Sequence, residues 1–199
     1  MTRAPCATAP AGPDDPHAET APSDWVRRFA PLVRAGGPVL DLACGAGRHA
    51  RLFHARGHPV AALDIDLSRL GALKDLPGIE AIVADLERNP WPLGERRFAG
   101  IVVANYLWRP LFRHLVEALE PGGALIYETF ARGNERFGKP SNPDYLLAPG
   151  ELLELARGRF AVVAYEHGLV SVPRPAVVQR IAALKLPADA GSATLAPPA

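Results

Sequence analysis

The chain has 199 residues, of which 48% are hydrophobic and 22% are charged, and its formal net charge is +1. This composition is that of a globular protein and gives no reason to expect nucleic acid or an anionic membrane as a partner. No apolar run reaches about 18 residues, so no transmembrane helix is predicted. The two cysteines, Cys6 and Cys44, are not expected to form a disulfide, which agrees with a cytoplasmic protein.

The two ends of the chain are expected to lie outside the folded domain. Residues 1–22 and 187–199 are rich in Ala and Pro and show no periodicity, which predicts a disordered or loosely packed N-terminal tail and a flexible C-terminal tail. Residues 23–186 then form one domain. At its start, Ser23 or Asp24 could cap a short helix that either covers a cofactor site or packs against a sheet.

From residue 38 onward, short apolar strands alternate with helices. Strands are predicted at 38–42, 60–65, 80–84, 99–105, 124–129, 160–166 and 177–186. Helices are predicted at 47–56, 67–76, 111–119 and 149–157, the last with a proline at its start. This alternation is typical of a doubly wound α/β sheet. Because the link 168–175 is too short for a crossover helix, the last strand is predicted to run antiparallel to its neighbour.

Ligands bind beyond the carboxyl ends of the strands in an open parallel sheet. At that edge, the glycine-rich turn 45–47 follows the first strand and opens a helix, so backbone N–H groups can face a ligand. Asp64 lies 19 positions after Gly45, a spacing at which a carboxylate holds a ribose, although it could instead cap the next helix. Asp85 could accept a hydrogen bond from adenine, beside the N–H of Leu86, or could simply form a turn.

The glycine turn alone does not decide the cofactor. Residues 45–50 match the pattern G-x-G-x-x-G/A, so an NAD-dependent oxidoreductase has to be considered. Asp41 stands just ahead of the turn, where a carboxylate would repel a pyrophosphate but could order the turn or receive an ammonium group. No proton donor for a carbonyl substrate stands out, which makes the oxidoreductase the weaker alternative.

Four stretches resemble the motifs of class I S-adenosylmethionine-dependent methyltransferases; they are residues 41–47, 62–66, 83–86 and 119–125. Within this class, residues 44–49 and 178–185 are similar to the compact tellurite-resistance-type methyltransferases. The resemblance implies a single Rossmann-like doubly wound sheet with strand order 3-2-1-4-5-7-6 and an antiparallel strand 7.

The resemblance also implies S-adenosylmethionine as cofactor and S-adenosylhomocysteine as product. Gly45 and Gly47 would face the methionine part, and Arg48 would pair with its carboxylate or remain a solvated helix arginine. Asn105 would lie near the methyl group. The residues implied for cofactor binding are Asp41, Ala43, Gly45, Gly47, Arg48, Asp64, Ile65, Asp85, Leu86 and Asn105. Ala43 stands where many members of the family have glycine.

The methyl acceptor is less well defined. A thiolate or an anionic chalcogen oxyanion needs no general base, whereas oxygen and nitrogen acceptors usually do. Candidate catalytic residues are Tyr106, Glu128, His167 and His49, and Glu166 is a further possible base. The segment of about 130–148, called the lid below, is expected to overhang the acceptor, with a structural loop as the alternative. Substrate-binding candidates are Tyr106, Trp108, Arg109, Phe130, Arg136 and Tyr145.

We therefore expect methyl transfer to a small polar or anionic acceptor: a thiol, a chalcogen oxyanion or a carboxylate. The enzyme is expected to be a monomer or homodimer without a metal site. Residues 105–108 do not form the Asn-Pro-Pro-Tyr motif typical of methyltransferases that act on amino groups of nucleic acids or glutamine. An RNA or protein methyltransferase of the same fold stays open as an alternative.

Overall fold

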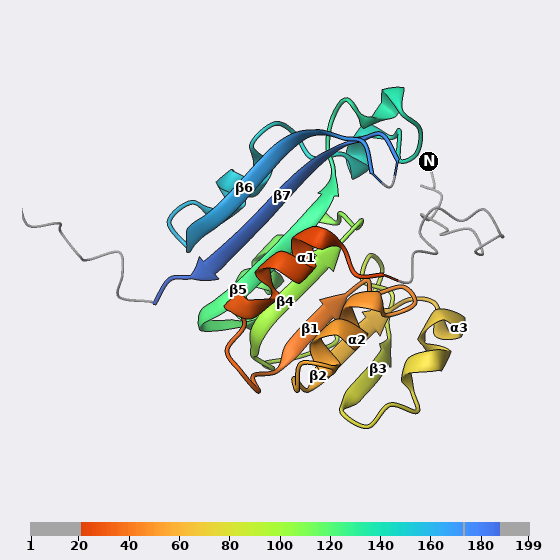
Figure 1. Ribbon diagram of the computed structural model, residues 1–199, viewed down its shortest axis with the longest axis vertical. Helices are drawn as coiled ribbons and strands as arrows, with labels where there is room; N and C mark the ends of the chain where they lie inside the picture. Colours follow the sequence, from red (N-terminus) through yellow and green to blue (C-terminus); the bar gives the residue numbers. More distant parts are fainter. Residues whose placement is uncertain (1–20, 173, 188–199) are drawn as a thin grey trace, which may run out of the picture.

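The computed structural model describes residues 21–172 and 174–187, which are built around a seven-stranded sheet (Figure 1). The strands follow the order β3-β2-β1-β4-β5-β7-β6. They are β1 (Val39–Leu42), β2 (Val60–Asp64), β3 (Ile79–Val83), β4 (Phe98–Ala104), β5 (Leu119–Phe130), β6 (Phe160–Val170) and β7 (Ala176–Lys185). Strands β1 to β5 are parallel, and β7 is antiparallel to both β5 and β6. The predicted strand order and the reversed β7 are confirmed.

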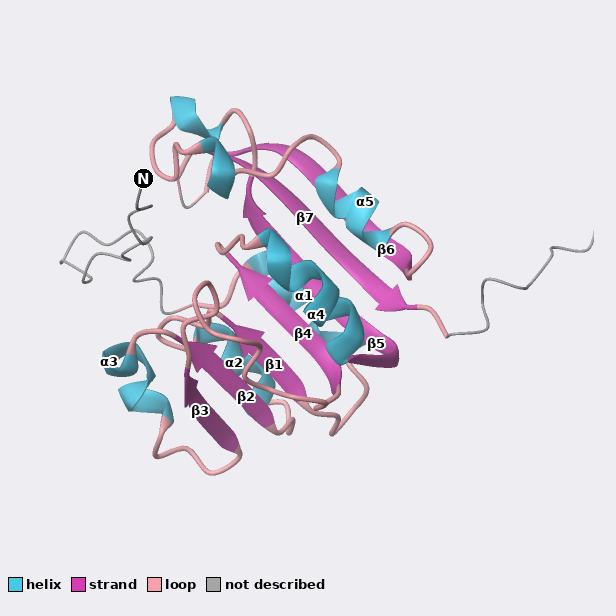
Figure 2. Cartoon of the chain, turned by 180° about the vertical axis from the view of Figure 1, so that it is seen from behind, coloured by secondary structure: helices cyan, strands magenta, loops and turns pink. Residues whose placement is uncertain are grey.

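Helices cover both faces of the sheet and make two hydrophobic layers (Figures 1 and 2). The α-helices are α1 (Asp24–Phe29), α2 (Arg48–His54), α3 (Leu67–Leu70), α4 (Phe112–Ala118) and α5 (Glu151–Ala156). Short 3₁₀ turns are η1 (Ala30–Leu32), η2 (Gly71–Leu73), η3 (Arg109–Leu111), η4 (Asn134–Arg136) and η5 (Pro143–Tyr145). Apolar side chains of α1, α2 and α3 pack on one face, and those of α4 and α5 on the other.

Helix α1 packs against the sheet, which is the second of the two roles considered for it. Ser23 is its N-cap and accepts a hydrogen bond from the N–H of Val26 at 3.2 Å. Trp25 and Phe29 are buried, and the indole N–H of Trp25 donates to the carbonyl of Ile181 on β7 at 3.3 Å. The cap thus starts the helix, and its buried aromatic face, with the Trp25 bond to β7, fixes it to the sheet.

Several predicted boundaries differ from the structure. Strand β5 begins at Leu119 rather than 124, and the helix predicted over 67–76 is one α-helical turn, α3, followed by η2. Helix α5 begins at Glu151, not at Pro149, because Gly150 adopts φ +76°, a left-handed conformation that interrupts the helix. Strand β6 continues to Val170, so β6 and β7 form a long hairpin.

The predicted tails fall mainly on residues 1–20 and 188–199, which lie outside the described residues. Between residues 21 and 187, position 173 excepted, no helix is long and apolar enough to cross a membrane.

Candidate functional site

Backbone strain gathers where β1 and β4, neighbours in the sheet, end side by side. Ala43 follows β1 with φ 54°, and Asn105 follows β4 with φ 56°. Within the described residues they are the two non-glycine positions with positive φ. The chain turns to opposite sides of the sheet at β1 and β4, and such a switch point is where α/β sheets bind ligands. Asn adopts this conformation more readily than Ala, and left-handed backbone at non-glycine residues is often found at functional sites, so the two strand ends are candidates for one.

The glycine turn is fixed to the end of β2 by Asp64. One carboxylate oxygen accepts a hydrogen bond from the N–H of Gly45 at 2.7 Å, and the other accepts from the N–H of Asp66 at 3.0 Å. A carboxylate offers about four acceptor sites, so Asp64 keeps capacity for a ligand hydroxyl. Next to it, Ile65 is 51% exposed.

Asp41 orders the start of helix α2. Its carboxylate is buried and accepts a hydrogen bond from the N–H of Ala50 at 2.8 Å. Burial raises the pKa of Asp41 to about 7, and the hydrogen bond from Ala50 partly opposes this increase. Asp41 was expected either to order the glycine turn or to receive an ammonium group; the hydrogen bond from Ala50 corresponds to the first role.

The two glycines of the turn have different surroundings. A Cβ atom on Gly47 would clash with the side chain of Leu73, so this glycine allows the turn to pack against η2. A Cβ on Gly45 would have Arg69 as its nearest neighbour, at 3.9 Å. Gly45 therefore borders open space, whereas Gly47, expected to face the cofactor, is explained by packing.

Asp85 forms a turn after β3, the alternative considered for it. One carboxylate oxygen accepts hydrogen bonds from the N–H groups of Glu87 and Arg88 at 3.0 and 3.1 Å. The side chain of Leu86 is buried. The suggested contact of these residues with adenine remains a prediction.

Arg48 and His49 connect helix α2 with the segment before α1. Arg48 donates to the carbonyl of Ala21 at 3.4 Å, and Nε2 of His49 accepts a hydrogen bond from the N–H of Ser23 at 3.2 Å. Burial, and secondarily the charge of Arg48, lowers the pKa of His49 to about 3. His49 was a candidate base, but it is buried and its Nε2 lone pair is already used, so its role here is structural.

Glu128, Arg180 and Glu166 lie in register on β5, β7 and β6. Glu128 is buried with a carboxylate oxygen 3.2 Å from Nε of Arg180, and Glu166 lies 3.5 Å from the same guanidinium group. His167 is exposed on the edge strand β6, three strand spacings or roughly 14 Å from β4. These three candidate bases are thus ion-paired or remote from the strained strand ends.

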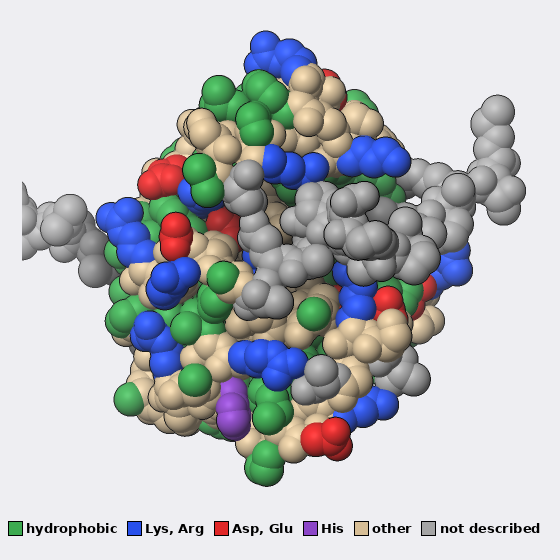
Figure 3. Space-filling view, turned by 45° about the vertical axis from the view of Figure 1, so that its right-hand side comes forward, with side chains coloured by type: hydrophobic (Ala, Val, Ile, Leu, Met, Phe, Trp, Pro, Cys, Tyr) green, Lys and Arg blue, Asp and Glu red, His purple; other side chains and the backbone are tan. Residues whose placement is uncertain are grey.

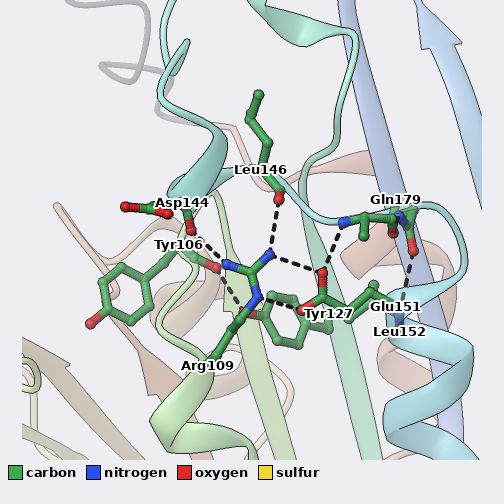
Figure 4. Close-up of polar contacts among 9 residues, drawn as sticks. Tyr106, Arg109, Tyr127, Asp144, Leu146, Glu151, Leu152 and Gln179 are labelled. Carbon is green, nitrogen blue, oxygen red and sulfur yellow. Dashed lines mark hydrogen bonds and ion pairs between the residues drawn. The ribbon is translucent and has the colours of Figure 1, made fainter.

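Arg109 clamps the end of the lid (Figure 4). Its guanidinium group makes two bonds to the carboxylate of Glu151, at 2.6 and 2.9 Å. It also donates to the carbonyls of Asp144 at 2.6 Å and Leu146 at 2.9 Å. Arg109, a substrate-binding candidate from the sequence, thus uses its guanidinium group to join the lid to Glu151 at the start of α5.

Phe130 also differs from expectation. It is buried among Leu146, Ala176 and Val178, so it packs the base of the lid instead of lining an open site. The other substrate-binding candidates keep accessible surface; Tyr106, Trp108 and Tyr145 are half-buried, and Arg136 is exposed.

The lid is a packed loop at the carboxyl end of β5, as its bridge between Ala131 and Leu147 shows. Buried Asn134 holds it together: its amide donates to the carbonyl of Pro140 at 3.0 Å and accepts from the N–H of Val177 at 3.2 Å. Sequence reasoning missed Asn134 because Val177 lies 43 residues further along the chain. It also missed Glu151, although a glutamate just after Pro149-Gly150 is a usual signal for the first turn of a helix.

Comparison with known proteins shows which family the glycine turn and its neighbouring strands resemble. Residues 39–123, which include β1 to β4 and the glycine turn, match the family model described as a methyltransferase domain. A malonyl-[acyl-carrier protein] O-methyltransferase of Serratia marcescens is 28% identical over 142 residues, covering 68% of this chain and 56% of the relative. The chain thus spans little more than half the length of this curated relative.

Solved structures share the fold at low sequence identity. TehB from Haemophilus influenzae superposes with a TM-score of 0.66 at 18% identity, covering 81% of this chain and 61% of TehB. The glycopeptide N-methyltransferase MtfA, solved with S-adenosylhomocysteine, superposes with a TM-score of 0.56 at 22% identity, covering 80% of this chain and 88% of MtfA. The strand order and these neighbours show that the chain has the fold of class I methyltransferases, and the domain match shows that residues 39–123 resemble a methyltransferase domain.

Proposed function

We propose that the protein transfers the methyl group of S-adenosylmethionine to a small anionic acceptor at the ends of β1 and β4. The observation that carries this proposal is the arrangement of the glycine turn at the switch point. Asp64 fixes Gly45 at 2.7 Å while both strand ends are held in strained, left-handed backbone. The glycine turn and both strand ends lie inside residues 39–123, which match the methyltransferase domain.

The residues present fit the cofactor. Asp64 retains acceptor capacity for ribose hydroxyls, and exposed Ile65 offers an apolar surface for a base. Gly45 leaves space beside the turn, and Asn105 and half-buried Tyr106 follow β4 at the neighbouring strand end. S-adenosylmethionine supplies, when bound, an electrophilic methyl group on a positively charged sulfur. The protein's part is to orient the acceptor towards this group and to exclude water.

An anionic acceptor suits the groups that surround the site. His49 is buried and hydrogen-bonded, Glu128 is ion-paired with Arg180, and His167 lies on the far edge of the sheet. An acceptor that already carries a negative charge needs none of them as a base. Carboxylates, thiolates and chalcogen oxyanions share this property. We place a carboxylate first, because the curated relatives are named malonyl-[acyl-carrier protein] O-methyltransferases.

The test is calorimetric titration with S-adenosylmethionine, S-adenosylhomocysteine and NAD. We expect both sulfur compounds to bind and NAD to give no heat. Tight NAD binding without a response to the other two would overturn the proposal. Radiolabelled methyl transfer to a malonyl thioester, thiols, selenite, tellurite and RNA then identifies the acceptor, and transfer to RNA alone would favour the nucleic-acid alternative.

A further inference from the structure

One exposed face of the lid carries positive charge around an aromatic side chain. We call it the basic face and define it by Arg132, Arg136, Lys139 and Arg174, with Phe137 among them. Arg132, Arg136 and Lys139 are exposed, Arg174 is half-buried, and Phe137 is 41% exposed. Figure 3 shows Lys and Arg side chains next to hydrophobic ones at the upper end of the molecule, where Figure 1 places the lid.

The four cations of the basic face form no ion pair with a described carboxylate. Within residues 21–172 and 174–187, nine arginines lie within 4.0 Å of a carboxylate, whereas no such ion pair involves the basic face. Arg174 instead donates to the carbonyl of Lys139 at 3.1 Å, and Arg136 lies 5.9 Å from the ring centre of Phe137. The carboxylate of Glu135 bonds back to the N–H of Gly133 at 2.7 Å.

The basic face is presented on a fixed platform. Asn134 joins the lid to β7, and two bonds from Arg109 to the carbonyls of Asp144 and Leu146 hold the lid's other end to η3. A prefolded surface of this kind loses little conformational freedom on binding. Arginine and aromatic side chains are also the residues most enriched at the centres of protein interfaces.

We propose that the basic face docks an acidic carrier protein that presents the methyl acceptor to the site. This inference rests on the proposed function and adds the partner. Backbone hydrogen bonds, and secondarily the charges of Arg136 and Arg132, lower the pKa of Glu135, but its carboxylate forms no ion pair with these two arginines within 4.0 Å. An acidic partner would bring further carboxylates to the four cations, which gives charge complementarity. The pocket of about 270 Å³ beside Pro38, Val60 and Phe98 lies at the opposite ends of the strands, so it does not belong to the basic face. A net charge of +1 does not favour RNA as the occupant.

The experiment compares the wild-type chain with an Arg132→Glu/Arg136→Glu/Lys139→Glu variant. The probe is malonyl-loaded acyl-carrier protein, whose binding is measured by biolayer interferometry with S-adenosylhomocysteine present. We expect the variant to bind at least tenfold more weakly, and wild-type binding to weaken as salt is raised from 50 to 300 mM. A matched control reverses three exposed cations at the other end of the molecule, Arg56, Arg97 and Arg157, and is expected to bind as wild type does.

Two further readouts keep this inference separate from the proposed function. Calorimetry should give both variants the wild-type affinity for S-adenosylhomocysteine, and circular dichroism should show that they fold. No binding of the carrier protein to the wild type, equal weakening in the two variants, or tighter binding of a transfer RNA probe would each overturn the docking proposal. The methyltransferase proposal would survive all three results, because it is tested by cofactor binding and small acceptors.

Discussion

The backbone of Ala43, at the end of β1, adopts a left-handed conformation that is unfavourable for alanine. Its φ of 54° places a side chain in a conformation that costs a non-glycine residue about 1–2 kcal/mol. Related methyltransferases often have glycine here, which has no such cost. The alanine is therefore tolerated because the rest of the turn, fixed by Asp64 and Asp41, holds the backbone in place.

We predict that Ala43→Gly stabilises the protein by about 1 kcal/mol, because it relieves the left-handed strain. Ala46, in the same turn, does not have a positive φ. Ala46→Gly should therefore destabilise by about 0.5–1 kcal/mol, because glycine only increases the entropy of the unfolded chain there. Urea unfolding measures both changes. Equal effects of the same sign would show that Ala43 is not strained.

Asp64→Asn tests the carboxylate at the end of β2. The amide keeps the size and can still accept from Gly45, but it loses the charge that favours ribose hydroxyls. We predict weaker S-adenosylmethionine binding by about 1–3 kcal/mol. Asp66→Asn is the control, since Asp66 caps α3 by accepting from the N–H of Ser68 at 2.8 Å. If the control weakens cofactor binding as much as Asp64→Asn, the ribose role is refuted.

At the scale of elements, the Arg109–Glu151 pair decides how firmly the lid is attached. It joins η3 to α5 and also binds two carbonyls of the lid. Burial works against ionisation of Glu151, but the bonds from Arg109 and from the N–H of Ala148 outweigh it and leave the pKa of Glu151 below its ordinary value. A bidentate, partly buried pair of this kind is worth more than an exposed one.

We predict that Glu151→Gln speeds amide hydrogen exchange of residues 144–148 about tenfold or more, because the lid opens more easily. Glu154→Gln on the same helix is the matched control. It removes a 2.6 Å pair with Arg157 in which both side chains are mostly exposed, so exchange should hardly change. Unchanged exchange in Glu151→Gln would mean that packing alone secures the lid.

The elements also show what the sequence could predict. The existence of the seven strands follows from local apolar runs, and the reversed β7 from the short link before it; their order is implied by the family resemblance, and the order and the reversal are confirmed. Two boundaries could not be predicted in this way. The first residues of β5 belong to the strand because they pair with β4, and α5 begins only after the left-handed Gly150. The roles of His49 and Arg109 depend on partners 26 and 35–42 residues away, which periodicity does not contain.

At the scale of the whole molecule, two buried groups oppose each other in the pH dependence of stability. The pKa of His49 falls from 6.5 to about 3 on folding. Between these pH values His49 is therefore protonated in the unfolded chain and neutral in the native state. The pKa of Asp41 rises from 3.8 to about 7, so above pH 4 the native state keeps a proton that the unfolded chain releases. Stability is lost towards acid through His49 and towards neutral pH through Asp41.

Between about pH 4 and 6.5 these two contributions have opposite slopes of about 1.4 kcal/mol per pH unit each, so they cancel. We predict that His49→Gln leaves only the slope of Asp41. Its free energy of unfolding, relative to wild type, should then fall by about 3 kcal/mol as the pH rises from 4.5 to 6.5. Asp41→Asn should give the opposite trend, rising over the same range. Urea unfolding at four pH values measures both. If the curves of free energy against pH ran parallel to that of the wild type, folding would not shift the pKa of either side chain. The contacts that join α1, α2 and β1 would then not form as one cooperative unit.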